Sequence, residues 1–86
     1  MAFHVYILVN PAGQTYVGQT NDLAHRLQQH NDPQYHGTLH TKRRAGPWRL
    51  LHSEEHATRA EAMRRERELK TGKGRDWIRR ELLGGC

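Results

Sequence analysis

The chain has 86 residues, of which 35% are hydrophobic and 27% are charged. A chain of this length forms one domain with a modest core, so we expect a single domain over residues 1–86. Fourteen Lys and Arg against nine Asp and Glu give a net charge of +5. This charge favours a polyanionic partner such as nucleic acid, although many small basic proteins have none. The sequence has no run of about 18 apolar residues and no signal-peptide pattern, so we expect no membrane association and a cytoplasmic location.

Two apolar segments at the start of the chain have the composition of β-strands. Residues 3–9 (FHVYILV) form a continuous apolar run, which is typical of a strand buried on both faces, and residues 14–19 form its shorter partner. Between them, Pro11 fixes φ and Gly13 permits a positive φ, as a tight turn requires. The sequence therefore predicts a β-hairpin.

Tyr6 and Tyr16 occupy one strand each of this hairpin. A turn at residues 10–13 places strand positions whose numbers add to about 22 or 23 opposite one another, which predicts that the two phenols are cross-strand neighbours facing one site. Tyr16 also suits a half-buried strand position with no chemical role. Gly18 indicates either a β-bulge, which the residues alone favour, or a close approach of the backbone to a ligand.

A helix is expected directly after the hairpin. Residues 20–22 (TND) supply N-cap candidates, and Leu23, Leu27 and His30 then share one helical face. Arg26 and His30 are four residues apart and project together. Each also has an ordinary interpretation, because an arginine suits an exposed surface and a histidine in the last turn of a helix interacts favourably with the helix dipole.

The second half of the chain predicts a loop, a strand and two helices. Residues 31–47 are interrupted by Pro and Gly and predict a long loop, which in a small domain is often functional. Residues 48–51 (WRLL) resume an apolar run and predict a third strand. A helix over residues 57–70 begins with a capping box at Thr58, and a final helix is expected over residues 75–83.

The long loop carries two histidines, His36 and His40, that are four residues apart. A structural zinc site needs three or four ligands, and no cysteine or nearby pair of carboxylates completes one. A solvated loop, or one that faces phosphate, is therefore the favoured interpretation.

Glu66 is the most informative residue outside the hairpin. At about 100° per residue it lies about 40° from Ala62, inside the apolar arc that Met63 and Leu69 complete. An ionised carboxylate on a core-facing side requires a compensating cation. The residues alone favour an ion pair, with Arg26 as a possible partner, and leave a bound metal ion as the alternative.

Several short motifs together resemble a known family. In chain order they are His4-Val5-Tyr6, Tyr16-Val17-Gly18, Asn21-Asp22-Leu23, Arg26-Leu27 and His30-Asn31. The pattern resembles the GIY-YIG nuclease superfamily, particularly its small stand-alone bacterial members. The likeness is strong over residues 3–31 and resumes at residues 41–51 and 60–70. The first triplet has His4 and Val5 in place of Gly and Ile, and it keeps the tyrosine.

The resemblance implies a fold and a set of site residues. The fold is an α/β domain of the α+β type, with a three-stranded antiparallel sheet and surrounding helices in the order β-β-α-β-α-α. Tyr6 matches the tyrosine thought to be the general base toward the attacking water, and Glu66 matches the glutamate that holds one divalent cation, Mg²⁺ or Mn²⁺. Tyr16 would orient the water or the phosphate, Arg26 would bind phosphate oxygens, and His30 would donate to the phosphate or assist the leaving oxygen. A free phenol has a pKa of about 10, so Tyr6 needs the positive charge of Arg26 and the metal nearby.

We therefore predict a metal-dependent endonuclease that hydrolyses nucleic-acid phosphodiester bonds, with DNA favoured by the resemblance and not by any one residue. Basic side chains are expected to hold the backbone without reading bases. They are Lys42, Arg43, Arg44, Arg64, Arg65 and Lys73. No small-molecule cofactor is expected, and protein partners are left open.

Two alternatives to an active nuclease stay open. Several members of the family have an asparagine after the glutamate helix, and this chain has none beyond Asn31. A nucleic-acid-binding module of the same fold with weak or no activity is therefore the first alternative. The second is a protein-interaction domain whose basic face meets an acidic partner.

Overall fold

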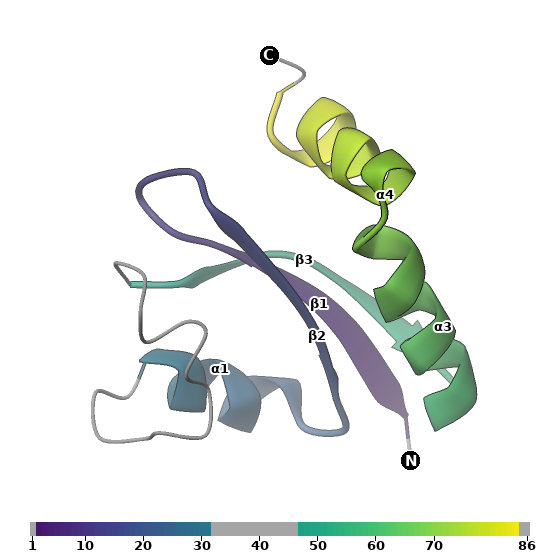
Figure 1. The fold of residues 1–86 in the computed structure, drawn as a ribbon. Coiled ribbons are helices and arrows are strands. Elements are labelled where there is room, and N and C mark those ends of the chain that lie inside the picture. Colours follow the sequence, from purple (N-terminus) through teal and green to yellow (C-terminus); the bar gives the residue numbers. More distant parts are fainter. Residues whose placement is uncertain (1, 32–46, 85–86) are drawn as a thin grey trace.

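The computed structural model describes residues 2–31 and 47–84 and has the predicted order of elements (Figure 1). The elements are strands β1 (Phe3–Val9) and β2 (Thr15–Thr20), helix α1 (Leu23–Asn31), strand β3 (Arg49–His56), helices α3 (Arg59–Leu69) and α4 (Gly72–Trp77), and the π-helical turn η1 (Ile78–Leu82). The strands form one antiparallel sheet in the order β2-β1-β3. The predicted α+β fold is confirmed. Within these residues no helix is long and apolar enough to cross a membrane.

Strand β1 lies in the middle of the sheet, between β2 and β3. Both of its faces are buried, as its unbroken apolar run predicts. On one face, Val5 and Ile7 pack against the buried side of α3. On the other face, Tyr6 and Leu8 pack with Trp48 and the apolar side of α1. Figure 1 shows α1 and α3 on opposite sides of the sheet. Each fully buried aliphatic side chain stabilises the fold by about 1.5–3 kcal/mol, so this strand anchors both layers.

Residues 10–14 connect β1 to β2. Gly13 N–H donates to Asn10 O over 3.0 Å, and Asn10 Oδ1 accepts from Gln14 N–H over 2.8 Å. Gly13 has a φ of +82°, so this position favours glycine, as predicted. The predicted register paired residues whose numbers add to 22 or 23, whereas the numbers of paired residues in the structure add to 24. Tyr6 pairs with Gly18, and Tyr16 pairs with Leu8. The prediction that the two tyrosines lie directly opposite one another is therefore wrong, although both lie on the same face.

Strand β3 is longer than predicted, because it continues to His56 and does not end at Leu51. The extra residues, HSEEH, are polar and carry no strand signal in the sequence. They are strand because the edge of β1 pairs with them, from Ile7 opposite His52 to Phe3 opposite His56. Tertiary pairing here overrides local propensity.

The last helix also begins earlier than predicted, at Gly72 and not at residue 75. Two glycines in the first turn hid this start from a propensity argument. Thr71 provides the N-cap, because its hydroxyl oxygen accepts from Gly74 N–H over 3.1 Å. A Cβ at Gly74 would lie 2.2 Å from Glu68 O, so glycine there allows α4 to pack directly against the end of α3.

A network centred on Glu54 connects β3 to α3. Arg65 donates two hydrogen bonds to the Glu54 carboxylate, from Nε over 2.8 Å and from Nη2 over 3.0 Å. His52 Nε2 and His56 Nε2 lie 3.0 and 3.4 Å from the same carboxylate. The Arg65 guanidinium also stacks on Trp77, 5.2 Å from the ring centroid. These contacts hold the helix that carries the candidate metal ligand against the sheet.

We expect Glu54→Gln to lower the free energy of unfolding by about 2 kcal/mol at neutral pH. This energy corresponds to a shift of about two units in the Glu54 pKa, reduced because the carboxylate is partly exposed. Burial raises the pKa of Glu54, but hydrogen bonds from Arg65 and His52 outweigh it and bring the pKa to about 2. Because the folded pKa is depressed, this stabilisation is present above the unfolded value of about 4.3. It is lost as the pH falls through about 2. Urea unfolding between pH 7 and pH 2 measures it, and identical profiles for the two proteins would contradict the prediction.

Candidate active site

Three aromatic side chains form a cluster between the sheet and α1. Tyr6 and His30 are 1% and 2% exposed, and the Tyr6 hydroxyl shares a 2.8 Å hydrogen bond with His30 Nε2. The ring centroid of Tyr16 lies 6.2 Å from that of Tyr6 and 4.8 Å from that of His30. The two tyrosines therefore face one site, as predicted, and His30, the next-to-last residue of α1, packs against both rings.

Asn31 fixes the end of α1 on which His30 lies. Its side-chain Nδ2 donates to Trp48 O over 2.8 Å, and its Oδ1 accepts from Trp48 N–H over 2.7 Å. The paired amide contact joins α1 to the start of β3, and Trp48 is itself buried under Tyr6. Asn31 belongs to the His30-Asn31 motif, but no sequence pattern predicts its contact with Trp48.

Gly18 makes room for the Tyr6 ring. A Cβ built at Gly18 would lie 2.6 Å from the Tyr6 hydroxyl oxygen and 3.0 Å from a ring carbon of Tyr16. Residue 18 pairs regularly with Tyr6 in the sheet, so the favoured interpretation of a bulge is wrong. The missing side chain instead lets the Tyr6 phenol pass over β2 toward the open edge of the sheet.

For the nuclease activity predicted from the sequence, we expect Gly18→Ala to slow phosphodiester cleavage by about 10² or more, the cost of displacing a positioned general base. The new methyl group must push the Tyr6 hydroxyl away from His30. Loss of that hydrogen bond and the steric strain should also lower the melting temperature. The comparison is Gly13→Ala, which is strained by its positive φ but has nothing within 4 Å of its Cβ. If both variants lose only stability and keep the wild-type rate, the close packing of Tyr6 on Gly18 has no catalytic importance.

The electrostatic surroundings keep the Tyr6 phenol protonated. Burial is the largest effect and raises the pKa of Tyr6, with a hydrogen bond from Arg26 acting in the opposite direction; the net pKa is about 12. The negative charge of Glu66 also raises this pKa, and the positive charge of Arg26 lowers it. At neutral pH the phenol is therefore a hydroxyl group and not a phenolate.

Arg26 lies one turn before His30 on α1, as the sequence predicts. Besides its interaction with Tyr6, its Nη1 donates to Gln29 Oε1 over 3.0 Å. The guanidinium is only partly buried. It therefore combines a fixed orientation with access for a ligand at the edge of the aromatic cluster.

Glu66, the candidate metal ligand, lies on α3. Its side chain is 24% exposed, and Glu66 Oε2 accepts from Lys70 Nζ over 2.9 Å. The predicted ion pair exists, but its partner is Lys70 and not Arg26. Lys70 is 51% exposed, so the pair lies at the surface and is not buried. The charge of Glu66 is the smallest of the effects on the Tyr6 pKa, and the connection of Glu66 to the aromatic cluster runs through Lys70, which lines one cleft with Tyr16.

The donor set around Glu66 suits a hard, largely hydrated cation. The part of the chain that the structure describes has no group of three His, Cys, Asp or Glu that could hold a metal ion. A lone carboxylate with water and substrate phosphate oxygens is a common Mg²⁺ environment, because Mg²⁺ gives up its water reluctantly. The Lys70 ammonium already occupies the position of a cation beside this carboxylate. Glu66 is therefore compatible with one Mg²⁺ or Mn²⁺ that keeps most of its water.

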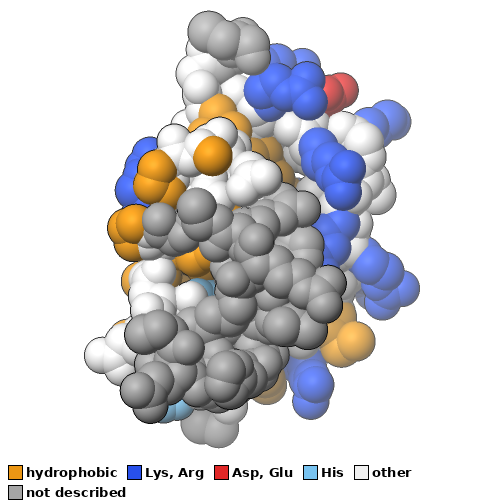
Figure 2. Space-filling model, turned by 60° about the vertical axis from the view of Figure 1, so that its left-hand side comes forward, with side chains coloured by type: hydrophobic (Ala, Val, Ile, Leu, Met, Phe, Trp, Pro, Cys, Tyr) orange, Lys and Arg blue, Asp and Glu red, His pale blue; other side chains and the backbone are white. Residues whose placement is uncertain are grey.

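The predicted phosphate-binding residues have different surroundings. Arg64 and Lys73 are exposed on α3 and α4. Arg65 instead binds Glu54 and stacks on Trp77, which leaves its guanidinium satisfied within the protein. The remaining three, Lys42, Arg43 and Arg44, lie outside the described residues. Figure 2 shows Lys and Arg side chains gathered along one side of the molecule.

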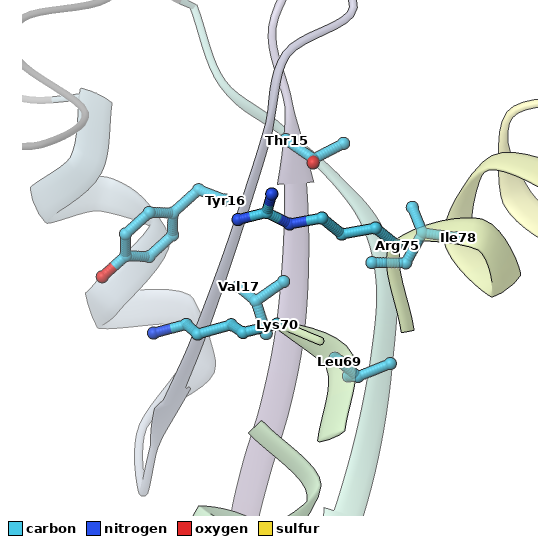
Figure 3. A pocket seen from close by; sticks show the side chains of 7 residues that line it. All are labelled: Thr15, Tyr16, Val17, Leu69, Lys70, Arg75 and Ile78. Carbon is cyan, nitrogen blue, oxygen red and sulfur yellow. The ribbon is translucent and has the colours of Figure 1, made fainter. Parts of the chain in front are cut away.

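Lys70 and Arg75 were not predicted as site residues, although both line a cleft beside Tyr16 (Figure 3). The sequence contains one signal for Lys70, its position four residues after Glu66 on the same helix. No such signal exists for Arg75, because its approach to β2 depends on how α4 packs.

Comparisons with known proteins identify the family to which the chain belongs. The chain is 39% identical over 67 residues to the UPF0213 protein of Staphylococcus aureus, a match that covers 78% of each chain. It is 48% identical over 54 residues to the structure-specific endonuclease subunit SLX1 homolog 1 of Trypanosoma cruzi, covering 57% of this chain and 10% of that protein's length. The solution NMR structure of a UPF0213 protein from Bacillus halodurans superimposes with a TM-score of 0.55 at 30% identity, over 99% of this chain and 87% of that one. The family model of the GIY-YIG catalytic domain matches residues 2–79. The chain therefore belongs to the GIY-YIG catalytic domain family.

Proposed function

We propose that the protein is a divalent-metal-dependent endonuclease that hydrolyses phosphodiester bonds in nucleic acid, with DNA as the preferred substrate, in the cytoplasm. The observation that carries the proposal is the surroundings of the Tyr6 phenol, which shares a hydrogen bond with His30 Nε2, interacts with the Arg26 guanidinium and experiences a smaller effect from the charge of Glu66. A proton acceptor, a phosphate-binding cation and a carboxylate for a metal are the parts that phosphodiester hydrolysis requires.

Tyr6 and His30 form a path for the proton of the attacking water. A phenol with a pKa of about 12 is almost never ionised at neutral pH. A free phenolate is therefore a poor candidate for the base, which changes the role predicted from sequence. Instead, the Tyr6 oxygen accepts the water proton while its own proton passes to neutral His30 Nε2, 2.8 Å away. The phenol stays neutral overall, and the charge moves to the imidazole.

Arg26 and Tyr16 hold the phosphate in place for this attack. The Arg26 fork can donate two hydrogen bonds to phosphate oxygens, and its attraction strengthens as negative charge grows in the transition state. Tyr16 packs on both Tyr6 and His30, so its phenol orients the water or the phosphate at the same edge.

Glu66 would hold Mg²⁺ or Mn²⁺, which when bound supplies positive charge to the phosphate and to the leaving oxygen. Lys70 must then leave the Glu66 carboxylate, since both cations need the same oxygens. Compensation of the Glu66 charge also removes one of the effects that raise the Tyr6 pKa. The carboxylate thus links metal binding to proton transfer at the phenol.

A binding module with little or no activity is the second candidate. Two observations favour it: the Tyr6 pKa of about 12 and the Lys70 ammonium already seated on Glu66. Both the nuclease and the binding module predict salt-sensitive binding to nucleic acid. Only the nuclease predicts cleavage that requires a divalent metal.

The test is incubation of the purified protein with labelled linear duplex, flapped, four-way and single-stranded DNA and with RNA. Branched substrates are included because one relative is named a structure-specific endonuclease subunit. We expect cleavage with Mg²⁺ or Mn²⁺ and none in EDTA. Binding without cleavage under all conditions favours the inactive module, and absence of binding to every nucleic acid at low salt rejects both.

A further inference from the structure

A cationic cleft lies beside the aromatic cluster, along the outer edge of β2. It has a volume of about 410 Å³. Its walls are Thr15, Tyr16 and Val17 of β2, Leu69 and Lys70 at the end of α3, and Arg75 and Ile78 beyond it. Strand β2 is an edge strand, so the cleft is open to solvent along the strand. Tyr16 belongs both to this cleft and to the aromatic cluster, so the two sites are continuous.

Two cationic side chains converge on the cleft from the helical side. Figure 3 shows the Lys70 ammonium and the Arg75 guanidinium both extending across β2 toward Tyr16. Among the described residues, no acidic side chain lines the cleft, and none lines the second hollow, of similar size, that continues from Arg75 to Gly13 and Arg79. No carboxylate in residues 2–31 and 47–84 forms an ion pair with Arg75. Lys70 is paired with Glu66, so Arg75 is the cation of this cleft whose charge no carboxylate in the described residues compensates by an ion pair.

The position of Arg75 is fixed by the junction between α3 and α4. Thr71 caps α4, and the Gly74 backbone lies directly against the last turn of α3. Only a residue without a Cβ permits this approach, so the direction of α4 is strongly constrained. The side chain of the next residue, Arg75, consequently lies beside β2, where it lines the cleft.

We propose that Lys70 and Arg75 form a clamp for one backbone phosphate that flanks the phosphate being cleaved. This rests on the proposed nuclease function, because a strand that crosses the Tyr6 site has further phosphates on both sides. The strand would run along β2 toward the β1–β2 turn. Lys70 and Arg75 supply charge-assisted hydrogen bonds to phosphate oxygens, and the Val17, Leu69 and Ile78 side chains offer an apolar wall to a sugar. Contacts of this type fix register and carry no sequence code.

The test couples single neutral phosphates to single cationic side chains. A DNA substrate that the protein cuts is synthesised as a series in which each phosphate near the cleavage position is replaced in turn by a neutral methylphosphonate. Binding of wild type, Arg75→Ala, the Lys70→Gln/Arg75→Ala double variant and Arg59→Ala to each member is measured by fluorescence anisotropy in EDTA. Arg59 is the matched control, because it is an exposed arginine at the opposite end of α3.

We expect one position, beside the cleaved bond, at which the methylphosphonate weakens wild-type binding by about 10-fold, the effect of one charge-assisted hydrogen bond. The Lys70→Gln/Arg75→Ala double variant should show almost no further loss at this position, and Arg75→Ala alone should show a smaller loss than wild type. Arg59→Ala should keep the wild-type loss. If every position weakens Arg75→Ala as much as it weakens wild type, the clamp is overturned while nuclease function stands. A wild type that neither binds nor cuts nucleic acid overturns the proposed function itself.

Salt dependence gives an independent measurement of the same contact. On duplex DNA each neutralised phosphate contributes about 0.9 to the slope of log affinity against log salt. The Lys70→Gln/Arg75→Ala double variant should therefore lower the magnitude of the slope by about 0.9, and Arg75→Ala alone should lower it by less, because both side chains hold one phosphate. A slope unchanged from that of Arg59→Ala would reject the clamp.

Discussion

Replacement of Tyr6 by Phe is expected to slow cleavage by about 10² to 10⁴, with nucleic-acid affinity changed by no more than about twofold. The substitution keeps the ring that fills the space over Gly18 and removes only the hydroxyl that passes a proton to His30. Without that oxygen, the water has no acceptor in line with the imidazole. Single-turnover rates at saturating protein, together with affinity in EDTA, separate the two effects.

The same change has a structural cost that must be measured beside the rate. The Tyr6→Phe variant removes the buried hydrogen bond between Tyr6 and His30 Nε2, and a typical hydrogen bond contributes about 0.5–1.5 kcal/mol to stability. Cleavage is therefore compared well below the melting temperature of both proteins. Tyr16→Phe is the comparison variant, because Tyr16 packs on the same rings and has a smaller assigned role. A Tyr6→Phe variant that cleaves at the wild-type rate would exclude Tyr6 from proton transfer and leave Tyr16 as the next candidate.

The hairpin explains why much of the site was predictable from sequence. The unbroken apolar run of β1 predicted burial on both faces, and both clusters of the core confirm it. Tyr6 pairs with Gly18 and not with Tyr16, a shift of two residues from direct pairing. Side chains alternate faces with a period of two, so a shift by an even number keeps both phenols on one face. The prediction of a shared site therefore survived an error in register.

Features that depend on contacts between distant segments were not predictable. The second half of β3 is polar, and it forms a strand because β1 pairs with it and Arg65 of α3 binds Glu54. Arg65 looked like a phosphate ligand because the sequence does not show which face of α3 meets β3. The clamp residue Arg75 was missed for the same reason, since its direction is set by the contact of Gly74 with the end of α3. Local patterns give the elements, and packing decides which charges are free to bind a ligand.

For Glu66, the sequence predicted the position on the apolar side of α3 but not the ion-pair partner, Lys70. The Glu66 carboxylate pairs with Lys70, which lines a cleft with Tyr16. A buried ion pair that loses one partner costs about 3–5 kcal/mol, whereas an exposed pair four residues apart on a helix contributes about 0.3–0.5 kcal/mol. With side chains 24% and 51% exposed, Glu66 and Lys70 belong to the second class. The fold therefore depends little on this carboxylate.

We expect Glu66→Gln to abolish metal-dependent cleavage and to leave the melting temperature in EDTA unchanged or slightly higher. The amide keeps the shape of the side chain, but it loses the negative charge that a divalent cation needs, and it removes an ionised group from the apolar side of a helix. Loss of the negative charge should also lower the Tyr6 pKa, because that charge is one of the effects that raise it. The measurements are a cleavage assay in Mg²⁺, a thermal melt in EDTA and an alkaline titration followed by tyrosinate absorbance. Glu68→Gln is the matched control, since Glu68 is 60% exposed on the same helix and pairs with Arg65; it should cleave like wild type. A large fall in melting temperature with cleavage intact would mean that Glu66 stabilises the fold and does not hold the metal.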